Sequence, residues 1–227
     1  MQVLALTLVP VGAAILGALL AVNTRPPASV VSAVQHLAAG VVFAATAVEI
    51  LPDLLHYKAP VATLVGGAAG ITLMLLVMRL EEAWKGPVGM VAATGIDLLV
   101  DGLVLGIGFA AGAKAGALLT VALTLEVLFL GLTLAEALGG SGSRTRAVVG
   151  TGLLMLGLPL GALVAAPVST LPGEYVAAFL SFGAMALLYL VTEELLVEAH
   201  EKPDSPWITS AFFVGFLAVL LLDELIG

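Results

Sequence analysis

The sequence predicts an all-α integral membrane protein with eight transmembrane helices. Hydrophobic residues make up 61% of its 227 residues and charged residues only 11%, a balance that excludes a water-soluble globular protein. Apolar runs of about 20 residues, each long enough to cross a bilayer, alternate with short polar or Pro/Gly-rich breaks. The predicted spans are residues 2–23, 30–56, 60–80, 88–113, 115–138, 146–166, 173–199 and 206–226.

These spans occupy nearly the whole chain, so residues 1–227 are predicted to form a single transmembrane domain. The first apolar run has no basic segment before it and no small-residue cleavage pattern after it, and we interpret it as a retained span. A net charge of −8 excludes a nucleic-acid-binding surface, and the absence of cysteine excludes disulfides and thiolate metal ligands. The predicted partners are therefore the lipid bilayer and cations.

The basic residues predict how the bundle is oriented. Two of them, Lys58 and Lys114, lie between spans on one side of the membrane, and the others lie in or beside the connections on the opposite side. By the positive-inside rule the richer side faces the cytoplasm, so both termini are predicted to be extracytoplasmic. The residues on the cytoplasmic side are Arg25, Arg79, Lys85, Arg144, Arg146 and Lys202.

The first three spans resemble the last three. Residues 10–13 read Pro-Val-Gly-Ala and residues 159–162 read Pro-Leu-Gly-Ala, while residues 49–56 and 193–200 each begin with Glu and end with His. Because two spans separate the triplets, equivalent helices cross the membrane in opposite directions. This pattern predicts a 3+2+3 inverted repeat, an arrangement in which transporters place their substrate site near the midplane.

Three carboxylates interrupt the two central spans. Asp97 and Asp101 are four residues apart and share one face of a helix, and Glu126 lies at a similar depth on the next, antiparallel span. Each charge near the bilayer centre costs about 2.5–3.5 kcal/mol on insertion scales. No basic residue lies inside 88–113 or 115–138, so a bound cation is the predicted compensation. The alternative is a set of protonated carboxyl groups that hydrogen-bond to neighbouring helices.

Small neighbours of these carboxylates have candidate roles of their own. Thr94 lies three residues before Asp97 on the same face, where it could add a hydroxyl ligand or hold a carboxylate. Gly102 and Gly106 form a small-x-x-x-small face that lets another helix approach closely, although a hinge role is an alternative.

Other acidic residues lie nearer the ends of the spans. Glu49 and Asp53, toward the outer end of the second span, are candidates for an outer metal-binding group. Glu193 is a candidate in the seventh span, because a glutamate pair this far into a span is costly if it has no role. The alternative for these residues is ordinary acids in the headgroup region. We interpret His36 as an interfacial residue and not as a ligand.

Several of these segments, in order, resemble the ZIP (Zrt/Irt-like) family of divalent-metal transporters, its prokaryotic branch in particular. The fourth span of that family usually reads His-Asn-x-x-(Glu or Asp)-Gly, and residues 97–102 read Asp-Leu-Leu-Val-Asp-Gly. The fifth usually reads (His or Gln)-(Glu or Asp)-x-Pro-(Glu or His)-(Gly or Glu), and residues 126–131 read Glu-Val-Leu-Phe-Leu-Gly. Residues 37–47, Ile-Leu-Pro-Asp at 50–53 and Glu-Glu-Leu-Leu-Val-Glu-Ala-His at 193–200 extend the resemblance over essentially the whole chain.

The resemblance implies a transporter, not an enzyme, that moves a divalent cation toward the cytoplasm through a site at midplane. By position, Asp97, Asp101 and Glu126 match the family's primary transport site. The resemblance also implies a homodimer in a prokaryotic cytoplasmic (inner) membrane, no resident cofactor, and movement of spans 1 and 4–6 against the remaining spans.

The chain departs from the family pattern in ways that change the expected site. Asp97 replaces the usual histidine, and the positions of the ligands for a second metal carry Leu98, Val127 and Leu130, which cannot coordinate. A single bound ion is therefore expected. The helix-loosening prolines of the fourth and fifth spans are also absent, so these helices are expected to be straighter.

The ligand chemistry limits the choice of ion. An all-oxygen site suits Mn²⁺, Mg²⁺ or Ca²⁺, with Fe²⁺ a middle case, whereas zinc favours Cys and His. The family resemblance implies zinc, iron or manganese. Three negative ligands on a dication leave one net negative charge, which predicts a retained proton and proton exchange when the ion binds.

Three other functions compete with metal transport. An intramembrane aspartyl protease would take one aspartate from each of two helices and a Gly-x-Gly-Asp signature, but Asp97 and Asp101 share one span and the signature is missing. A ZIP-like protein that binds cations or a partner without transporting, and a passive cation or proton pathway, are the further alternatives.

Overall fold

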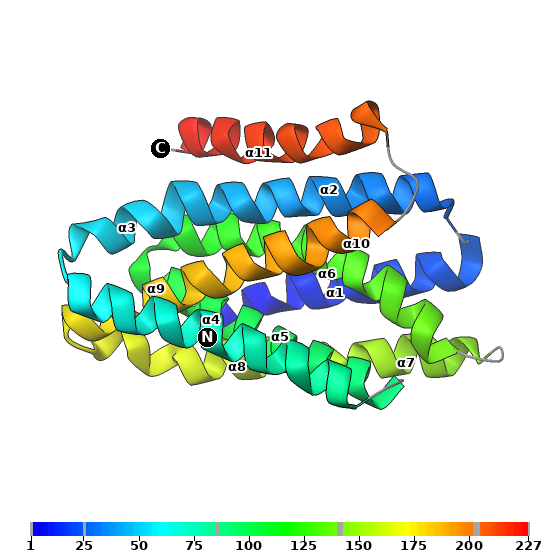
Figure 1. Cartoon of the computed structure of the whole chain (residues 1–227), viewed down its shortest axis with the longest axis horizontal. Coiled ribbons are helices and arrows are strands. Elements are labelled where there is room, and N and C mark those ends of the chain that lie inside the picture. The colour runs from blue at the N-terminus through cyan, green and yellow to red at the C-terminus, as the bar shows by residue number, and fades with distance from the viewer. Residues whose placement is uncertain (1, 25, 85–86, 140–142, 202–204, 227) are drawn as a thin grey trace.

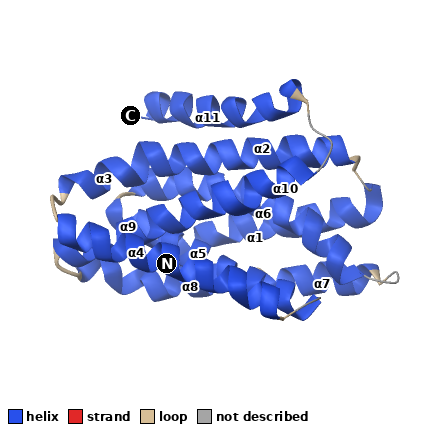
Figure 2. Ribbon diagram, viewed as in Figure 1, coloured by secondary structure: helices blue, strands red, loops and turns tan. Residues whose placement is uncertain are grey.

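Eight apolar helical spans, joined by short connections, form the structure, a computed structural model (Figures 1 and 2). Among the described residues every regular element is helical, and each span is long and apolar enough to cross a membrane. The prediction of an all-α, eight-span chain is confirmed, and it fits a multi-pass membrane protein. The structure describes residues 2–24, 26–84, 87–139, 143–201 and 205–226.

Five of the eight spans are single helices and three are divided into shorter segments. The single helices are α1 (Gln2–Thr24), α4 (Pro60–Ala83), α5 (Pro87–Ala111), α6 (Ala113–Gly139) and α11 (Pro206–Ile226). The second span is α2 (Ala28–Ala45), η1 (Thr46–Ile50) and α3 (Leu51–His56); the sixth is α7 (Arg144–Leu154), α8 (Gly157–Ala165) and η2 (Ala166–Thr170); the seventh is α9 (Gly173–Tyr189), η3 (Leu190–Leu195) and α10 (Leu196–Glu201).

The helices associate chiefly in four pairs. α1 packs along α6, α5 along α8, α4 along α9, and α2 along α11. The central contact joins α5 to α6, and the helices of spans 2, 4, 5 and 7 are the most buried. α11 is the most exposed span and packs mainly on α2, at the edge of the bundle in Figure 1.

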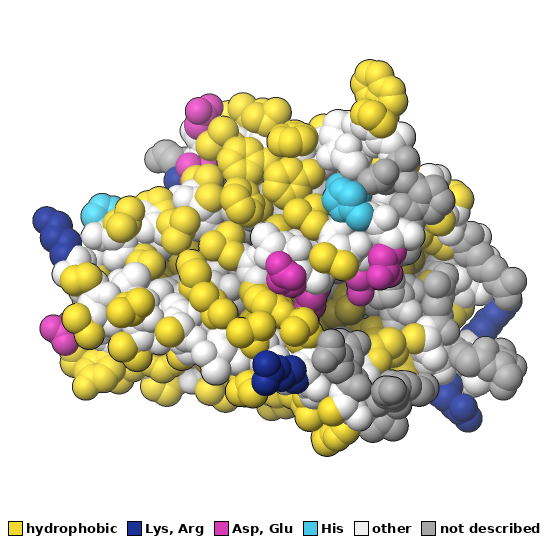
Figure 3. Space-filling view, in the orientation of Figure 1, with side chains coloured by type: hydrophobic (Ala, Val, Ile, Leu, Met, Phe, Trp, Pro, Cys, Tyr) yellow, Lys and Arg dark blue, Asp and Glu magenta, His cyan; other side chains and the backbone are white. Residues whose placement is uncertain are grey.

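The outer surface of the bundle is apolar, as a lipid-facing surface must be. Leucines and a phenylalanine on four different spans are at least half exposed, and hydrophobic side chains cover much of the face shown in Figure 3. They are Leu8, Leu64, Leu163 and Phe213.

The second and seventh spans each contain a π-helical turn. In η1 the N–H of Leu51 bonds to the carbonyl of Thr46, and in η3 the N–H of Leu196 bonds to that of Val191, so both bonds span five residues. Pro52, the second residue after η1, has no N–H to donate, which favours a local change of bonding pattern there. The sequence analysis did not predict either turn.

The sixth span differs from the prediction of one run over 146–166. It covers Arg144–Thr170 and breaks at Met155 and Leu156, between α7 and α8. Pro159 cannot donate to the carbonyl of Met155, which instead accepts from the N–H of Leu158 in a tighter turn. In contrast, α5 and α6 are uninterrupted, as expected from their lack of internal proline.

Glycines bring the paired helices into backbone contact. A Cβ on Gly102 would collide with the carbonyl of Leu158, and a Cβ on Gly161 would collide with that of Leu99, so α5 and α8 contact each other reciprocally. Gly106 likewise faces Ala162 on α8. The predicted close approach of another helix at Gly102 and Gly106 is confirmed. Equivalent contacts join the other pairs: Gly17 to Leu128, Gly131 to Ala14, Gly40 to Phe212, Gly215 to Leu37, Gly66 to Ala178 and Gly70 to Phe182.

We expect Gly102→Ala to destabilise the protein by about 1–3 kcal/mol, because the added methyl group meets backbone that cannot rotate away. Thermal unfolding of the detergent-purified chain measures this effect. Gly12→Ala is the matched control, because nothing lies within 4 Å of a Cβ at that helical position. Equal melting temperatures for the two variants would contradict this account of the α5–α8 contact.

Candidate metal centre

The three central carboxylates meet at the contact between α5 and α6. Asp97 and Asp101 lie one turn apart on α5, and Glu126 faces them from the middle of α6. One carboxylate oxygen from each residue lies within 4.8 Å of the other two. The residues are buried, with relative exposures of 8%, 1% and 3% respectively. The predicted meeting of these residues at one depth is therefore present in the structure.

Two oxygens of this cluster have no hydrogen-bond donor against them. Asp101 Oδ2 and Glu126 Oε2 are buried and have no hydrogen-bond partner within the described part of the chain. A buried acceptor left unsatisfied costs about 1–3 kcal/mol, and a charged one costs more. Asp101 and Glu126 also lie close enough to hydrogen-bond when one of them carries a proton. A cation, or a shared proton, is what this geometry accommodates.

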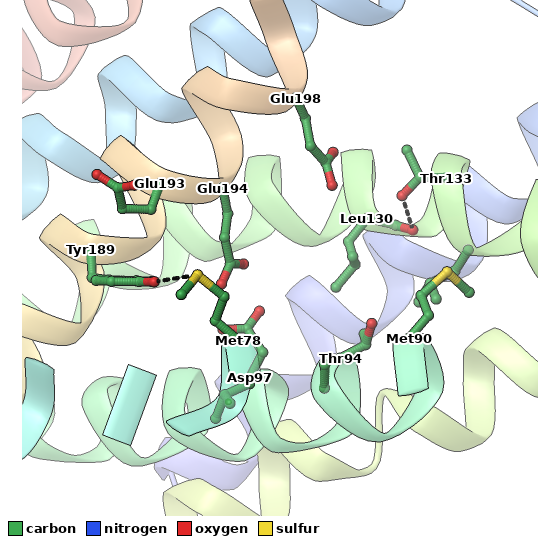
Figure 4. Close-up of a pocket in the computed structure, with 13 residues that line it drawn as sticks. Met78, Met90, Thr94, Asp97, Leu130, Thr133, Tyr189, Glu193, Glu194 and Glu198 are labelled. Atoms are coloured by element: carbon green, nitrogen blue, oxygen red, sulfur yellow. Dashed lines mark hydrogen bonds between the residues drawn. The ribbon is translucent and has the colours of Figure 1, made fainter. Parts of the chain in front are cut away.

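Glu194 is a fourth acidic residue at this centre, and the sequence analysis did not single it out. It acts electrostatically on both Asp101 and Glu126, and in Figure 4 it extends from η3 toward Asp97. Glu194 follows the buried residues Leu187 and Val191 by seven and three positions, the spacing of one helical face. That spacing was available in the sequence as a signal.

The predicted candidate on this span, Glu193, lies differently. Its side chain is exposed and turns away from the central carboxylates in Figure 4, although the residue borders the same cavity. The structure therefore does not bring Glu193 into the cluster, and a role for it in metal binding stays a prediction.

A cavity of about 280 Å³ reaches the carboxylate cluster at Asp97. Its walls come from the end of α4, the start of α5, the second half of α6, and the segment from Tyr189 to Glu198 (Figure 4). Asp97 and Glu194 lie in this wall, and half-buried Thr94 lines it one turn from Asp97. The space-filling view shows acidic side chains beside a hollow on this face (Figure 3).

The opposite approach to the carboxylates is closed by packed apolar side chains. They follow Asp101 along α5 and precede Glu126 along α6, and each is no more than 1% exposed. An ion at the cluster would therefore exchange with the cavity side alone in this conformation. The closing residues are Val104, Leu105, Leu118, Leu119 and Leu123.

Glu49 and Asp53 lie in a separate group beyond this apolar layer. Lys114, in the first turn of α6, lies with its Nζ 2.6 Å from Asp223 Oδ1 and 3.8 Å from Glu49 Oε1. Asp53 interacts electrostatically with Glu49. The ion pairs join α11 and the second span to α6. A lysine ammonium thus provides a positive charge where the sequence predicted an outer metal-binding group, and metal binding there stays a prediction.

The positions that the family resemblance assigns to a second metal carry apolar side chains. Leu98 and Val127 are fully buried in the core, and Leu130 lines the cavity beside the cluster. None of these side chains carries a donor atom. They offer no ligand for a second ion, and a site for a single ion stays a prediction.

Comparison with protein-family models gives no match for this chain, and comparison with curated proteins gives none either. The function must therefore be inferred from the residues and their geometry.

The cavity predicts different reactivity at two positions of α5. We expect Thr94→Cys to react with a small charged thiol reagent at least about tenfold faster than Val104→Cys, because position 94 lines the cavity and position 104 is packed in the apolar layer. The natural chain has no cysteine, so it serves as the background without labelling. Labelling rates in detergent measure the difference. Equal rates would contradict access from one side.

Proposed function

We propose that this chain is a ZIP-type transporter that moves a divalent metal cation of the zinc, iron or manganese class toward the cytoplasm. The transported ion binds a single site formed by Asp97, Asp101 and Glu126. The observation that carries this proposal is the convergence of three carboxylate oxygens within 4.8 Å, from two buried apolar helices, beside a cavity that Asp97 lines.

The electrostatics of the centre support a cation as the substrate. Three carboxylates so close together repel one another when charged, and Glu194 adds to that repulsion. A dication offsets most of this charge and satisfies the buried oxygens of Asp101 and Glu126. Retention of one proton by the cluster, released or taken up as the ion binds, is the charge balance that we expect.

The one-sided cavity supports alternating access. The ion exchanges with one side here, and a second conformation must open the apolar layer around Val104 and Leu119 while closing the cavity. A permanently open pore would instead expose the cluster to both sides at once. The rate of transport through two conformations saturates as the ion concentration rises. The rate of flow through a passive pathway saturates much less.

The helix pairing supports the inverted repeat. In the inverted repeat, spans 1, 2 and 3 correspond to spans 6, 7 and 8, and span 4 corresponds to span 5. The helix pair α1–α6 then corresponds to the pair α8–α5, and the pair α4–α9 corresponds to the pair α11–α2. The π-helical turns η1 and η3 lie at equivalent positions of the second and seventh spans, and each contains the glutamate of its repeat, Glu49 or Glu193. The same pairs form two groups, spans 1 and 4–6 and spans 2, 3, 7 and 8, which are the groups expected to move against each other.

The basic residues support the proposed orientation, and the cavity lies toward the end of the bundle that they mark as cytoplasmic. Arg79 lies near the end of α4, next to the cavity residues Val77 and Met78, at the end of the bundle predicted to be cytoplasmic. In this orientation the structure is open to the cytoplasm and both termini are outside.

A prokaryotic cytoplasmic membrane and a homodimer belong to the same proposal through the family resemblance. Arg25, Lys85 and Lys202, which contributed to the prediction, lie outside the described residues.

We expect Glu126→Gln to reduce saturable metal uptake into liposomes by at least about tenfold, because the variant keeps the shape of the side chain but removes a charged ligand. Uptake of Mn²⁺, Fe²⁺ and Zn²⁺ by the reconstituted chain measures this, with Mg²⁺ and Ca²⁺ as competitors. Glu174→Gln, the same change at an exposed position on α9, is the control and should transport normally.

Each outcome separates the candidate functions. Uptake that is unchanged in Glu126→Gln would overturn the proposal. Metal binding by the natural chain without uptake would favour a cation-binding protein that does not transport. Uptake that rises in proportion to ion concentration without saturation would favour a passive pathway.

A further inference from the structure

A second group of polar residues lies between α2 and α10 and uses none of the central carboxylates. The sequence analysis interpreted His36 as an interfacial residue, but the structure buries it, with an exposure of 1%. It faces His200 with ring centroids 5.0 Å apart and ring planes inclined by 64°. The two histidines are far apart in the sequence, and the structure brings them together because α10 packs on α2. Figure 1 shows α10 beside the first half of α2.

Two side-chain hydrogen bonds hold these helices in register. Ser32 Oγ donates to the carbonyl of Ala199 at 3.0 Å, and Gln35 Nε2 donates to Glu198 Oε2 at 2.8 Å. Each bond adjoins one of the histidines along the chain. The facing imidazoles are thus positioned by a polar contact between helices and not by apolar packing alone.

The hydrogen bonds of the rings decide which nitrogen atoms can bind a ligand. His36 Nδ1 lies 2.9 Å from the carbonyl of Ser32, and His200 Nδ1 lies 2.6 Å from that of Leu196. A carbonyl oxygen only accepts, so Nδ1 carries the hydrogen in each ring and Nε2 of the neutral ring carries the lone pair. His36 Nε2 is buried and has no hydrogen-bond partner among the described residues.

We propose that His36 and His200 bind one transition-metal ion through their Nε2 atoms. Two imidazoles on one tetrahedral ion, with metal–nitrogen bonds of about 2.0–2.1 Å, place their ring centroids roughly 5 Å apart. Metal-binding histidines usually donate the N–H of their other ring nitrogen to a carbonyl, a carboxylate or water, and His36 and His200 donate Nδ1–H to carbonyls in this way. Imidazole nitrogens select Zn²⁺, Cu²⁺, Ni²⁺ or Fe²⁺ and disfavour Mg²⁺ and Ca²⁺.

The surroundings make this an exchangeable site. His200 is exposed, so water can complete the coordination, in contrast to a structural site closed by four protein ligands. Glu198, two residues before His200, borders the cavity that leads to the central carboxylates. If the proposed transport function holds, an ion that leaves the cavity meets nitrogen ligands next to its mouth; the binding site itself does not depend on that function.

Electron paramagnetic resonance of one equivalent of Cu²⁺ added to the full chain, purified without a histidine tag, tests the site directly. We expect the hyperfine pattern of two imidazole nitrogens. His200→Gln should lose that pattern and weaken Cu²⁺ binding at least about tenfold, and this variant changes an exposed side chain that the core does not need. His36→Gln should have the same effect.

Two controls separate this site from the rest of the chain. His56→Gln removes the only other histidine, at the opposite end of the second span, and should keep the pattern. Asp101→Asn should also keep it, whether or not the central carboxylates bind metal. An unchanged Cu²⁺ signal in His200→Gln would overturn the proposal.

Discussion

The structure depends on one electrostatic constraint: three carboxylates lie in the apolar core, where no described lysine or arginine compensates them. Asp97, Asp101 and Glu126 lie on α5 and α6, two of the most buried spans, and Asp97 lines a cavity. Folding must place these groups without water, and only a cation or protons can balance them. The ammonium of Lys114 is engaged by Asp223 and Glu49 on the other side of an apolar layer.

The surrounding helices show how such a centre can be both rigid and switchable. Within each pair, glycines allow backbone-to-backbone contact, so α5 and α8, or α4 and α9, are expected to move as units. Between the two groups of pairs lie the cavity on one side and the Lys114 ion pairs on the other. The π-helical turns η1 and η3 interrupt the two long spans that border this boundary, and such turns occur frequently at functional sites.

Most of the fold could be predicted from the sequence, because lipid allows only a few solutions. Apolar runs revealed the spans, and the four-residue spacing of Asp97 and Asp101 placed both on one helical face. The carboxylate cluster could be predicted because it depends on two adjacent spans whose relative depth follows from a short connection. The small-residue pattern at Gly102 and Gly106 likewise predicted a contact that α8 supplies.

Features that depend on contacts between distant spans could not be predicted. The pairing of His36 with His200 needs the packing of α10 on α2, and the salt bridge from Lys114 to Asp223 needs that of α11 beside the second span. Glu194 is an exception, because its spacing from the buried residues Leu187 and Val191 marks the inward face of the seventh span, whereas the predicted Glu193 lies outside that face.

Mn²⁺ binding by the purified chain tests the central claim most directly, since Mn²⁺ prefers the oxygen ligands that this cluster offers. Equilibrium dialysis, with X-ray absorption of the bound ion, should find one Mn²⁺ per chain in an all-oxygen coordination shell, lost in Asp101→Asn. Absence of binding, or binding that persists unchanged in Asp101→Asn, would contradict a cation site and identify the three carboxylates as protonated structural groups.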